Sequence, residues 1–222
     1  MSLELYGNLL SQPARAVAVF LSANKVPFET KLIDIMKGDN KKPEFLKLNP
    51  FHKIPVIDDN GFVVRESVAI LRYLCHEKNV PDHWYPKDSK EQARVDEYLE
   101  WHHLDTRFNC MNFFAVKYLA PMFTGKPPNS KEVSQAEEKM KTTLGLIENI
   151  WLKNKPYLIN NAVTIADLLA VCEVEQLRMG DYDARTEYPN IAAWMERVRQ
   201  DVNPHYDDAN KLLNKVVAKR KA

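Results

Sequence analysis

The sequence has few cysteines and few glycines, and each scarcity excludes a class of protein. Three cysteines occur in 222 residues, at Cys75, Cys110 and Cys172, and they form no C-x-x-C pair. This spacing excludes a disulfide framework and favours free thiols in a reducing compartment, so we expect a cytoplasmic protein. The six glycines form no G-x-G-x-x-G run, so the dinucleotide-binding fingerprint is absent.

No sign of charge dominates, and no long hydrophobic run occurs. Lys and Arg total 31 against 30 Asp and Glu, and a net charge of +1 favours neither nucleic acid nor an anionic membrane as a partner. The apolar stretch 16–21 is far too short to span a bilayer, and residues 1–5 lack the basic and apolar regions of a secretory signal.

The histidines do not have the spacing of a metal site. The six include the neighbours His102 and His103, which point to different faces of a helix and cannot share a metal, and no H-E-x-x-H occurs. We therefore expect no metal cofactor.

Hydrophobic periodicity divides the chain into an α/β part and an all-helical part. A 45% hydrophobic and 27% charged composition fits a globular protein. Residues 1–79 show the order strand, helix, strand, hairpin, helix, which is the order of a thioredoxin-like domain; the second strand is predicted over 28–35. Residues 80–88, rich in proline and aromatics, are an ordered linker. Residues 89–222 show helical spacing only, beginning with one long or kinked helix over 89–119 that ends at Pro121.

One stretch, residues 49–74, carries most of the functional signal. Two short β-branched and aromatic runs flank Asn60-Gly61, a pair that tolerates positive φ and predicts a hairpin. Ser67 is a natural N-cap for the apolar-periodic helix that follows.

The same stretch can bind a small peptide. A cis Ile54-Pro55 bond would turn the backbone groups of Ile54 outward, where an extended peptide can pair with them as an added strand. Glu66 and Ser67 place a carboxylate, a hydroxyl and free N–H groups at a helix start, which suits an amino acid end with its ammonium and carboxylate.

Asn-Pro-x-x-Lys-Ile-Pro-Val, followed by Glu-Ser and Val-Ala-Ile-Leu-x-Tyr-Leu, resembles the glutathione site of cytosolic glutathione transferases. In that family the proline is cis, the residue before it pairs with the cysteinyl backbone, and the Glu-Ser pair holds the γ-glutamyl end. The resemblance therefore implies that Ile54, Glu66 and Ser67 bind glutathione. The alternative is a plain hairpin–helix unit without a ligand.

Ser11 is the candidate catalytic residue. It lies just before a helix, with Arg15 one turn further on, and thiolates are favoured at helix N-termini and beside hydrogen-bond donors. Ser11 would donate its O–H to a bound thiolate; it has no base that would make it a nucleophile. The alternative is a simple helix cap.

The phrase over residues 9–17, Leu-Leu-Ser-Gln-Pro-x-Arg-Ala-Val, resembles the theta class of the family. In that class a serine at this position stabilises the glutathione thiolate, in place of the tyrosine of other classes. Tyr6 falls inside the first strand, so we interpret it as structural. No cysteine lies near Ser11, which argues against glutaredoxin-like disulfide chemistry.

Three further residues are candidates for the glycine end of the tripeptide. Lys41 and Lys53 are placed to reach its carboxylate, or they are simply solvated lysines. Theta members usually have histidine where Asn40 stands, and asparagine can hydrogen-bond there but cannot carry charge.

In the helical part, the resemblance implies that Arg107 lies near the thiolate and helps to hold it anionic; the alternatives are a surface arginine or a dimer salt bridge.

Thr164 and Asp167 form a capping-box-like helix start that resembles the folding motif of the transferases, so Asp167 is assigned to structure. The resemblance also implies that the C-terminal segment can cover the electrophile pocket, so residues 206–217 are a candidate lid. Met111, Phe114, Tyr118 and Met122 are candidates for the wall of an electrophile pocket or for the core.

Together these residues identify the chain as a theta-like member of the cytosolic glutathione transferases. The resemblance implies the two-domain transferase fold, glutathione as co-substrate, a small apolar electrophile as second substrate, and a homodimer. Two alternatives stay open: a non-catalytic carrier or assembly domain of the same fold, and a glutathione-dependent peroxidase or dehalogenase that uses the same thiolate.

Overall fold

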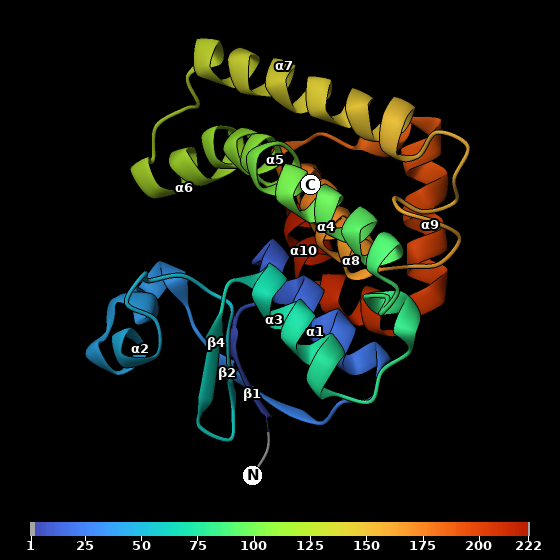
Figure 1. Cartoon of the computed structure of the whole chain (residues 1–222). Coiled ribbons are helices and arrows are strands. Elements are labelled where there is room, and N and C mark those ends of the chain that lie inside the picture. The colour runs from blue at the N-terminus through green and yellow to red at the C-terminus, as the bar shows by residue number, and fades with distance from the viewer. Residues whose placement is uncertain (1–2, 222) are drawn as a thin grey trace.

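A mixed sheet with its helices forms the first part of the chain, and helices alone form the rest (Figure 1). The structure is a computed structural model that describes residues 3–221. The first part contains, in order, β1 (Leu3–Gly7), α1 (Gln12–Ala23), β2 (Phe28–Leu32), α2 (Pro43–Leu48), β3 (Val56–Asp59), β4 (Phe62–Arg65) and α3 (Ser67–Glu77). The predicted thioredoxin-like α/β unit followed by an all-α part is confirmed.

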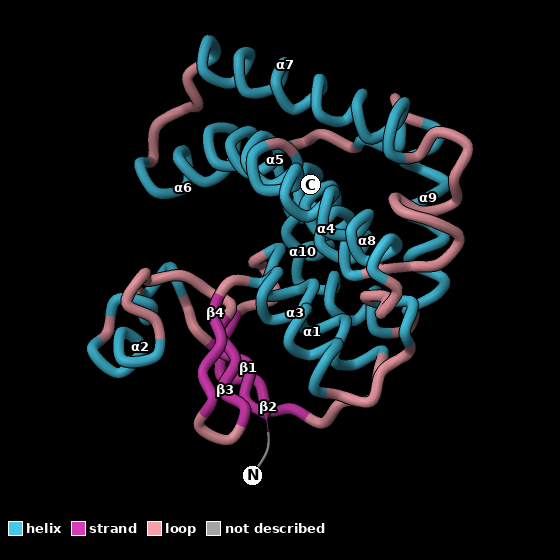
Figure 2. Tube along the Cα trace, in the orientation of Figure 1, coloured by secondary structure: helices cyan, strands magenta, loops and turns pink. Residues whose placement is uncertain are grey.

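The sheet has the strand order β2-β1-β3-β4 (Figure 2). β1 and β2 are parallel and joined through α1, whereas β3 is antiparallel to both β1 and β4. Parallel neighbours need a crossover, and α1 supplies it. α1 and α3 lie on the side of the sheet that faces the helical part, and α2 lies away from it (Figure 1).

The hairpin between β3 and β4 forms where Asn60-Gly61 predicts it. Asn60 has φ 56° and Gly61 has φ 93°, so both adopt the left-handed region that a two-residue hairpin turn requires. The Gly61 N–H donates to Asp58 Oδ1 at 2.6 Å, which fixes the turn.

The predicted extent of the second strand is wrong at its end. β2 stops at Leu32. The Asp34 carboxylate accepts the Met36 N–H at 3.0 Å and caps a short 3₁₀ turn over Ile35–Lys37. An aspartate that satisfies backbone donors locally competes with the strand ladder, so the apolar run 32–35 does not continue as a strand.

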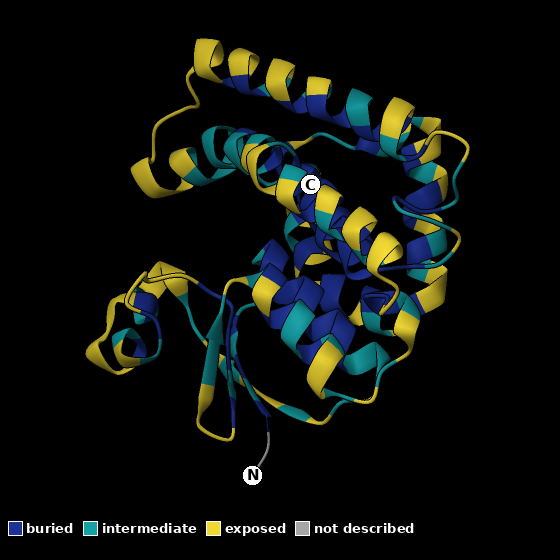
Figure 3. Cartoon of the chain, viewed as in Figure 1, coloured by how far each residue is buried: buried dark blue, intermediate teal, exposed yellow. Residues whose placement is uncertain are grey.

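The helical part is arranged around one buried helix. Its helices are α4 (Ser89–Leu104), α5 (Thr106–Phe114), α6 (Ala120–Thr124), α7 (Ser130–Leu146), α8 (Ile165–Gln176), α9 (Pro189–Val202) and α10 (His205–Lys221). Every residue of α8 is buried. In Figure 3 the buried residues gather where α1, α8 and α10 meet, so α1 of the first part packs directly on the core of the second.

The predicted helix over 89–119 is present in its kinked form, but its predicted end at Pro121 is wrong. The chain breaks at Asp105, with φ −111° and ψ −82°, and a second helix begins at Thr106. It then passes through Pro121 and ends at Gly125, with φ 68°. A wide π-type turn over Ala115–Leu119 precedes the proline. Proline lacks an N–H and its ring crowds the preceding turn, and a widened turn accommodates both defects without ending the helix.

The start of α8 has the predicted capping box. The Asp167 carboxylate accepts hydrogen bonds from the Thr164 N–H at 2.8 Å and its hydroxyl at 2.9 Å. It also accepts from the Leu158 N–H at 3.0 Å and the Trp194 Nε1–H at 2.8 Å. The Asp167 side chain is fully buried and joins α8, α9 and the loop before α8. Its role is therefore structural.

Because His102 on α4 is buried, we expect the free energy of unfolding to fall in acid. Its ring is 2% exposed, and its Nδ1 has no hydrogen-bond partner among residues 3–221. Burial, with the neighbouring charges of His103 and Arg107, lowers the pKa of His102 to about 3. Between pH 6.5 and 3 the unfolded chain binds a proton that the folded chain does not, so acid favours unfolding, by roughly 3 kcal/mol at pH 4.5.

The measurement is the free energy of unfolding by denaturant at pH 7.5 and pH 4.5, for the wild type and His102→Gln. We expect the acid-induced loss to be smaller in the variant by roughly 3 kcal/mol. An equal loss in both proteins would show that His102 does not cause it. His76→Gln, at an exposed position on α3, is the matched control.

Candidate functional site

Three features of the first part meet at one end of the sheet. Tyr6 pairs with Val56, and Val56 pairs with Arg65, so these residues form one row across β1, β3 and β4. The chain leaves this row toward Ser11 after β1 and toward Glu66 after β4, and it enters through Ile54-Pro55 before β3. The strand register thus brings the segment at Ser11 together with two segments that lie more than forty residues further along the chain.

Ser11 lies at the N-cap position of α1 but does not act as a cap. Its N–H donates to Asn8 O at 2.8 Å, and its carbonyl accepts from the Arg15 N–H at 2.9 Å. Its side chain makes no capping bond, and its hydroxyl has no partner among the described residues. The hydroxyl is half-buried. It is therefore free to donate to a ligand at the start of α1.

The peptide bond between Ile54 and Pro55 is cis, and Ile54 is 8% exposed. Asn49 shapes the loop before it: its Nδ2 donates to Lys53 O at 2.7 Å, and its Oδ1 accepts from Phe51 N at 3.0 Å. Within residues 3–221 neither the N–H nor the C=O of Ile54 has a hydrogen-bond partner. This backbone is available to pair with an added extended strand.

Glu66 has an unusual backbone at the start of α3. Its φ is 65° and its ψ 118°, a conformation that costs about 1–3 kcal/mol for a residue with a side chain. Arg65 beside it donates from Nε to Leu48 O at 2.5 Å and anchors this corner. The exposed Glu66 side chain makes no capping bond.

The predicted N-cap at Ser67 is displaced by one residue. Ile70 N donates to Glu66 O at 2.8 Å, so Glu66 is the cap and Ser67 opens the helix. The reason is the backbone of Glu66, which turns its carbonyl into the helix one residue early. In the described chain nothing accepts from the first three N–H groups of α3, which suits a bound carboxylate.

The candidates for the glycine end lie in two adjacent loops. Asn40 is 8% exposed and its Nδ2 donates to His52 O at 2.8 Å, which ties its 3₁₀ turn to the loop before Ile54. Its Oδ1 is buried without a partner among residues 3–221. Lys41 and Lys53 are exposed, and neither forms an ion pair with a described residue.

Arg107 on α5 is bound to a buried carboxylate. Its Nη1 donates to Glu173 Oε1 at 2.8 Å and Oε2 at 3.1 Å. The Glu173 side chain is 1% exposed and that of Arg107 is 32% exposed. Burial raises the pKa of Glu173, and Arg107 opposes that rise. Nε and Nη2 of Arg107 have no partner among the described residues, so they can bind an anion.

An apolar cluster adjoins the Ser11 loop. Leu10, Met111 and Tyr118 pack against a buried cluster that includes Phe114. Gln12 Nε2 lies 3.6 Å from Met111 Sδ. Three of the four predicted wall residues therefore lie together. Met122 is 43% exposed and lies outside this cluster.

The sequence did not single out Leu10, Leu119 or Met179, which also belong to this cluster. The remaining members, Leu213, Val216 and Val217, lie on α10. Leu213 and Val217 belong to the proposed lid over 206–217, and Arg220 lies 5.2 Å from the Tyr118 ring centroid. The helical spacing of the apolar residues on α10 could have indicated that they are buried. Spacing alone does not show which part of the protein the apolar face of a terminal helix packs against.

No described residues form a metal site: residues 3–221 contain no group of three or more His, Cys, Asp or Glu side chains that could hold an ion. Cys75, Cys110 and Cys172 are free thiols. No helix in this range is both long enough and apolar enough to cross a membrane.

Comparison with known proteins gives consistent matches. Residues 1–76 match the family model "Glutathione S-transferase, N-terminal domain", and residues 111–201 match "Glutathione S-transferase, C-terminal domain". Glutathione S-transferase theta-1 of Homo sapiens is 37% identical over 216 residues, which cover 97% of this chain and 90% of that protein. Theta-1 of Bos taurus is 38% identical over 202 residues, covering 91% and 84%.

Solved structures agree with these relatives. The apo form of human glutathione-S-transferase T1-1 superposes with a TM-score of 0.93 at 36% identity, covering 98% of this chain and 91% of that one. Human glutathione transferase theta-2, in complex with glutathione and an unknown ligand, superposes with a TM-score of 0.93 at 35% identity, covering 98% and 90%.

Proposed function

This chain belongs to the glutathione S-transferase family with theta-class relatives, and from that premise we propose that Ser11 activates the glutathione thiol for attack on small apolar electrophiles. The protein is a transferase whose co-substrate is glutathione. The observation that carries the proposal is the row Tyr6–Val56–Arg65, because it gathers three sets of unpaired polar groups at one end of the sheet.

These groups match the parts of glutathione in order. The free backbone groups of Ile54 pair with the cysteinyl residue, and the N–H groups at the start of α3 bind the γ-glutamyl carboxylate together with Ser67. Glu66 holds the ammonium. Lys41, Lys53 and the unpaired Oδ1 of Asn40 serve the glycine end.

The bound thiol then lies beside the Ser11 hydroxyl and the start of α1. A free thiol with a pKa near 8.5 is only a few per cent ionised at neutral pH, so a shift of about two units would raise the thiolate roughly twentyfold. Ser11 donates its O–H to the thiolate sulfur and stays unmodified. The thiolate attacks the electrophilic carbon, a C–S bond forms, and the leaving group departs with its electron pair.

The apolar cluster beside Leu10 forms the electrophile pocket. Its walls come from α5 and α10, so the second substrate lies between the loop before Ser11 and the C-terminal helix. Aromatic and aliphatic walls favour a small apolar electrophile. The free Nε and Nη2 donors of Arg107, which Glu173 positions, would stabilise the thiolate or a departing anion.

The division of labour follows the two parts of the chain. We assign glutathione binding to residues 1–79, the electrophile pocket to 89–222, and a connecting role to the linker 80–88. A homodimer and a cytoplasmic location complete the proposal. Analytical ultracentrifugation tests the dimer.

The direct test of function combines binding with turnover. We expect calorimetry to detect glutathione binding, and we expect conjugation with at least one of an aryl halide, an alkyl halide and an epoxide. Binding without any turnover, with an organic hydroperoxide also tried, would favour the carrier alternative. Turnover of the hydroperoxide or alkyl halide alone would favour a peroxidase or dehalogenase.

Glu66→Gln is expected to raise KM for glutathione about tenfold and to leave KM for the electrophile nearly unchanged. The substitution removes the charge that holds the glutathione ammonium, and a hydrogen bond to a charged group contributes about 1.5–3 kcal/mol. Steady-state kinetics with each substrate varied in turn makes the measurement. Glu138→Gln, on the exposed face of α7, is the control. An unchanged KM for glutathione in Glu66→Gln would contradict this role.

A further inference from the structure

We propose that Arg15 is a positioning residue for the reaction: from behind Ser11 it holds the loop that carries the serine, and its unpaired charge keeps the thiol site electropositive. Arg15 is 0% exposed, so it cannot touch a substrate from solvent. The inference rests on the proposed role of Ser11 and goes beyond it, because it assigns part of the thiolate stabilisation to a residue outside the binding site.

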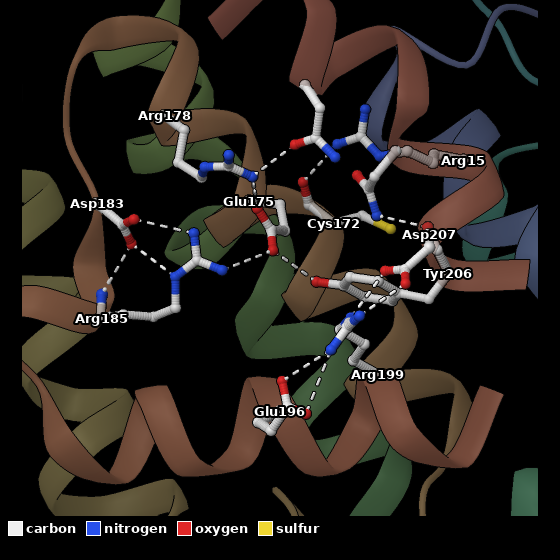
Figure 4. Close-up of polar contacts among 12 residues, drawn as sticks. Arg15, Cys172, Glu175, Arg178, Asp183, Arg185, Glu196, Arg199, Tyr206 and Asp207 are labelled. Carbon is white, nitrogen blue, oxygen red and sulfur yellow. Dashed lines mark hydrogen bonds and ion pairs between the residues drawn. The ribbon is translucent and has the colours of Figure 1, made fainter. Parts of the chain in front are cut away.

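The guanidinium of Arg15 joins α1 to α8. Its Nη1 donates to Leu9 O at 2.8 Å, and its Nη2 donates to Cys172 O at 2.9 Å and to Gln176 Oε1 at 2.9 Å. Figure 4 shows Arg15 and Cys172 facing each other across this contact. Leu9 lies two residues before Ser11, and α8 is the most deeply buried helix. The loop is therefore anchored to a rigid element.

All three acceptors of Arg15 are electrically neutral. Its Nε has no partner among residues 3–221, and no described carboxylate hydrogen-bonds to it. A buried cation without a paired anion is costly, so proteins seldom place one without compensation.

The carboxylates closest along α8 are already bound to other arginines. Glu173 pairs with Arg107 at 2.8 Å. Glu175 pairs with Arg178 at 2.9 Å and Arg185 at 3.2 Å, and it accepts from the Tyr206 hydroxyl at 2.8 Å. In Figure 4 Arg178 lies to the left of Arg15, and Glu175, Arg185 and Tyr206 lie lower in the view. Arg15, like Arg107, opposes the rise in the pKa of Glu173, but among the described residues it forms no ion pair with either carboxylate, so its positive charge has no paired anion of its own.

That charge lies close to the start of α1. Arg15 is four residues after Ser11, which is about 6 Å along the helix axis. A cation in the low-dielectric interior favours the anionic form of a nearby thiol, in the same direction as the helix N-terminus. Arg15 therefore adds to the effect of Ser11 and does not replace it.

The sharpest test neutralises the charge without removing the side chain. Gln176→Glu places a carboxylate where Nη2 of Arg15 already donates and keeps the shape of the residue. We expect the apparent pKa of the glutathione thiol bound to the enzyme to rise by about one unit, with a thiolate fraction near neutral pH that falls severalfold to tenfold. KM for glutathione should change little. Gln200→Glu, exposed on α9, is the control for an added negative charge.

A second pair of variants separates charge from anchoring. Arg15→Lys keeps the positive charge but loses the planar guanidinium, whose several donors anchor the loop. The pKa of the bound thiol should therefore stay near that of the wild type, while kcat falls. Arg15→Met removes both and should raise the pKa and lower kcat. Circular dichroism checks that each variant folds. If Arg15→Met does not fold, the thiol pKa measured for Gln176→Glu tests the role of the charge alone.

The outcomes distinguish this inference from the proposed function. A depressed thiol pKa in the wild type that Gln176→Glu leaves unchanged overturns the role of Arg15 alone. No thiolate in the wild type with bound glutathione overturns the proposed function itself. A higher pKa of the bound thiol in Gln176→Glu and in Arg15→Met, with an unchanged pKa in Arg15→Lys, supports the role of the Arg15 charge.

Discussion

Ser11→Ala is expected to lower kcat/KM for conjugation about 10²–10³-fold and to leave KM for glutathione within a few-fold of the wild type. Removing one preorganised donor to a developing or stabilised anion typically has an effect of this size. The hydroxyl of Ser11 has no partner within residues 3–221 and makes no capping bond, so its loss should not weaken α1. The measurement is steady-state kinetics with glutathione and a reactive aryl halide.

The control for that substitution is Ser134→Ala, at an exposed position on α7. Unfolding by denaturant should give the same free energy for the Ser11 variant and the wild type, within about 0.5 kcal/mol. A kcat/KM for Ser11→Ala within threefold of the wild type would contradict the role of this hydroxyl. A large loss of stability would instead revive the interpretation of Ser11 as a helix cap.

Asp167→Ala is expected to lower the free energy of unfolding by about 3–5 kcal/mol. The change leaves four buried donors without an acceptor, from Leu158, Thr164 and Trp194, at distances of 2.8–3.0 Å in the intact protein. For a chain of this size that corresponds to a melting temperature lower by roughly 10 °C. Chemical denaturation monitored by tryptophan fluorescence makes the measurement.

Asp208→Ala is the matched control, because both side chains of its ion pair with Lys211 are exposed and the pair should contribute little to stability. Asp167→Asn should fall between the two, since an amide keeps the shape but offers one acceptor oxygen. A loss below 1 kcal/mol in Asp167→Ala would show that these bonds do not hold α8 in place.

Local signals predicted the parts of the fold and of the site that depend on neighbouring residues. Asn60-Gly61 predicted the hairpin because both residues tolerate positive φ, and Thr164 with Asp167 predicted the start of α8 because a capping box needs only one turn. The position of Ser11 before α1 follows from the same kind of reasoning.

Contacts distant in sequence could not be predicted in this way. Arg107 meets Glu173 across 66 residues, and Arg15 meets Gln176 across 161. The break at Asp105 has no glycine or proline to mark it, so the hydrophobic spacing of α4 and α5 suggested one helix. These features depend on how helices pack in three dimensions, which periodicity along the chain does not specify.

In the proposed mechanism the protein ionises the thiol of bound glutathione through Ser11. The most direct measurement is the ultraviolet thiolate absorbance of the glutathione complex as a function of pH, for the wild type and Ser11→Ala. We predict an apparent pKa well below that of free glutathione in the wild type and a return toward the free value in the variant. Glutathione that binds the wild type but keeps the thiol pKa of free glutathione would contradict the proposed role of Ser11.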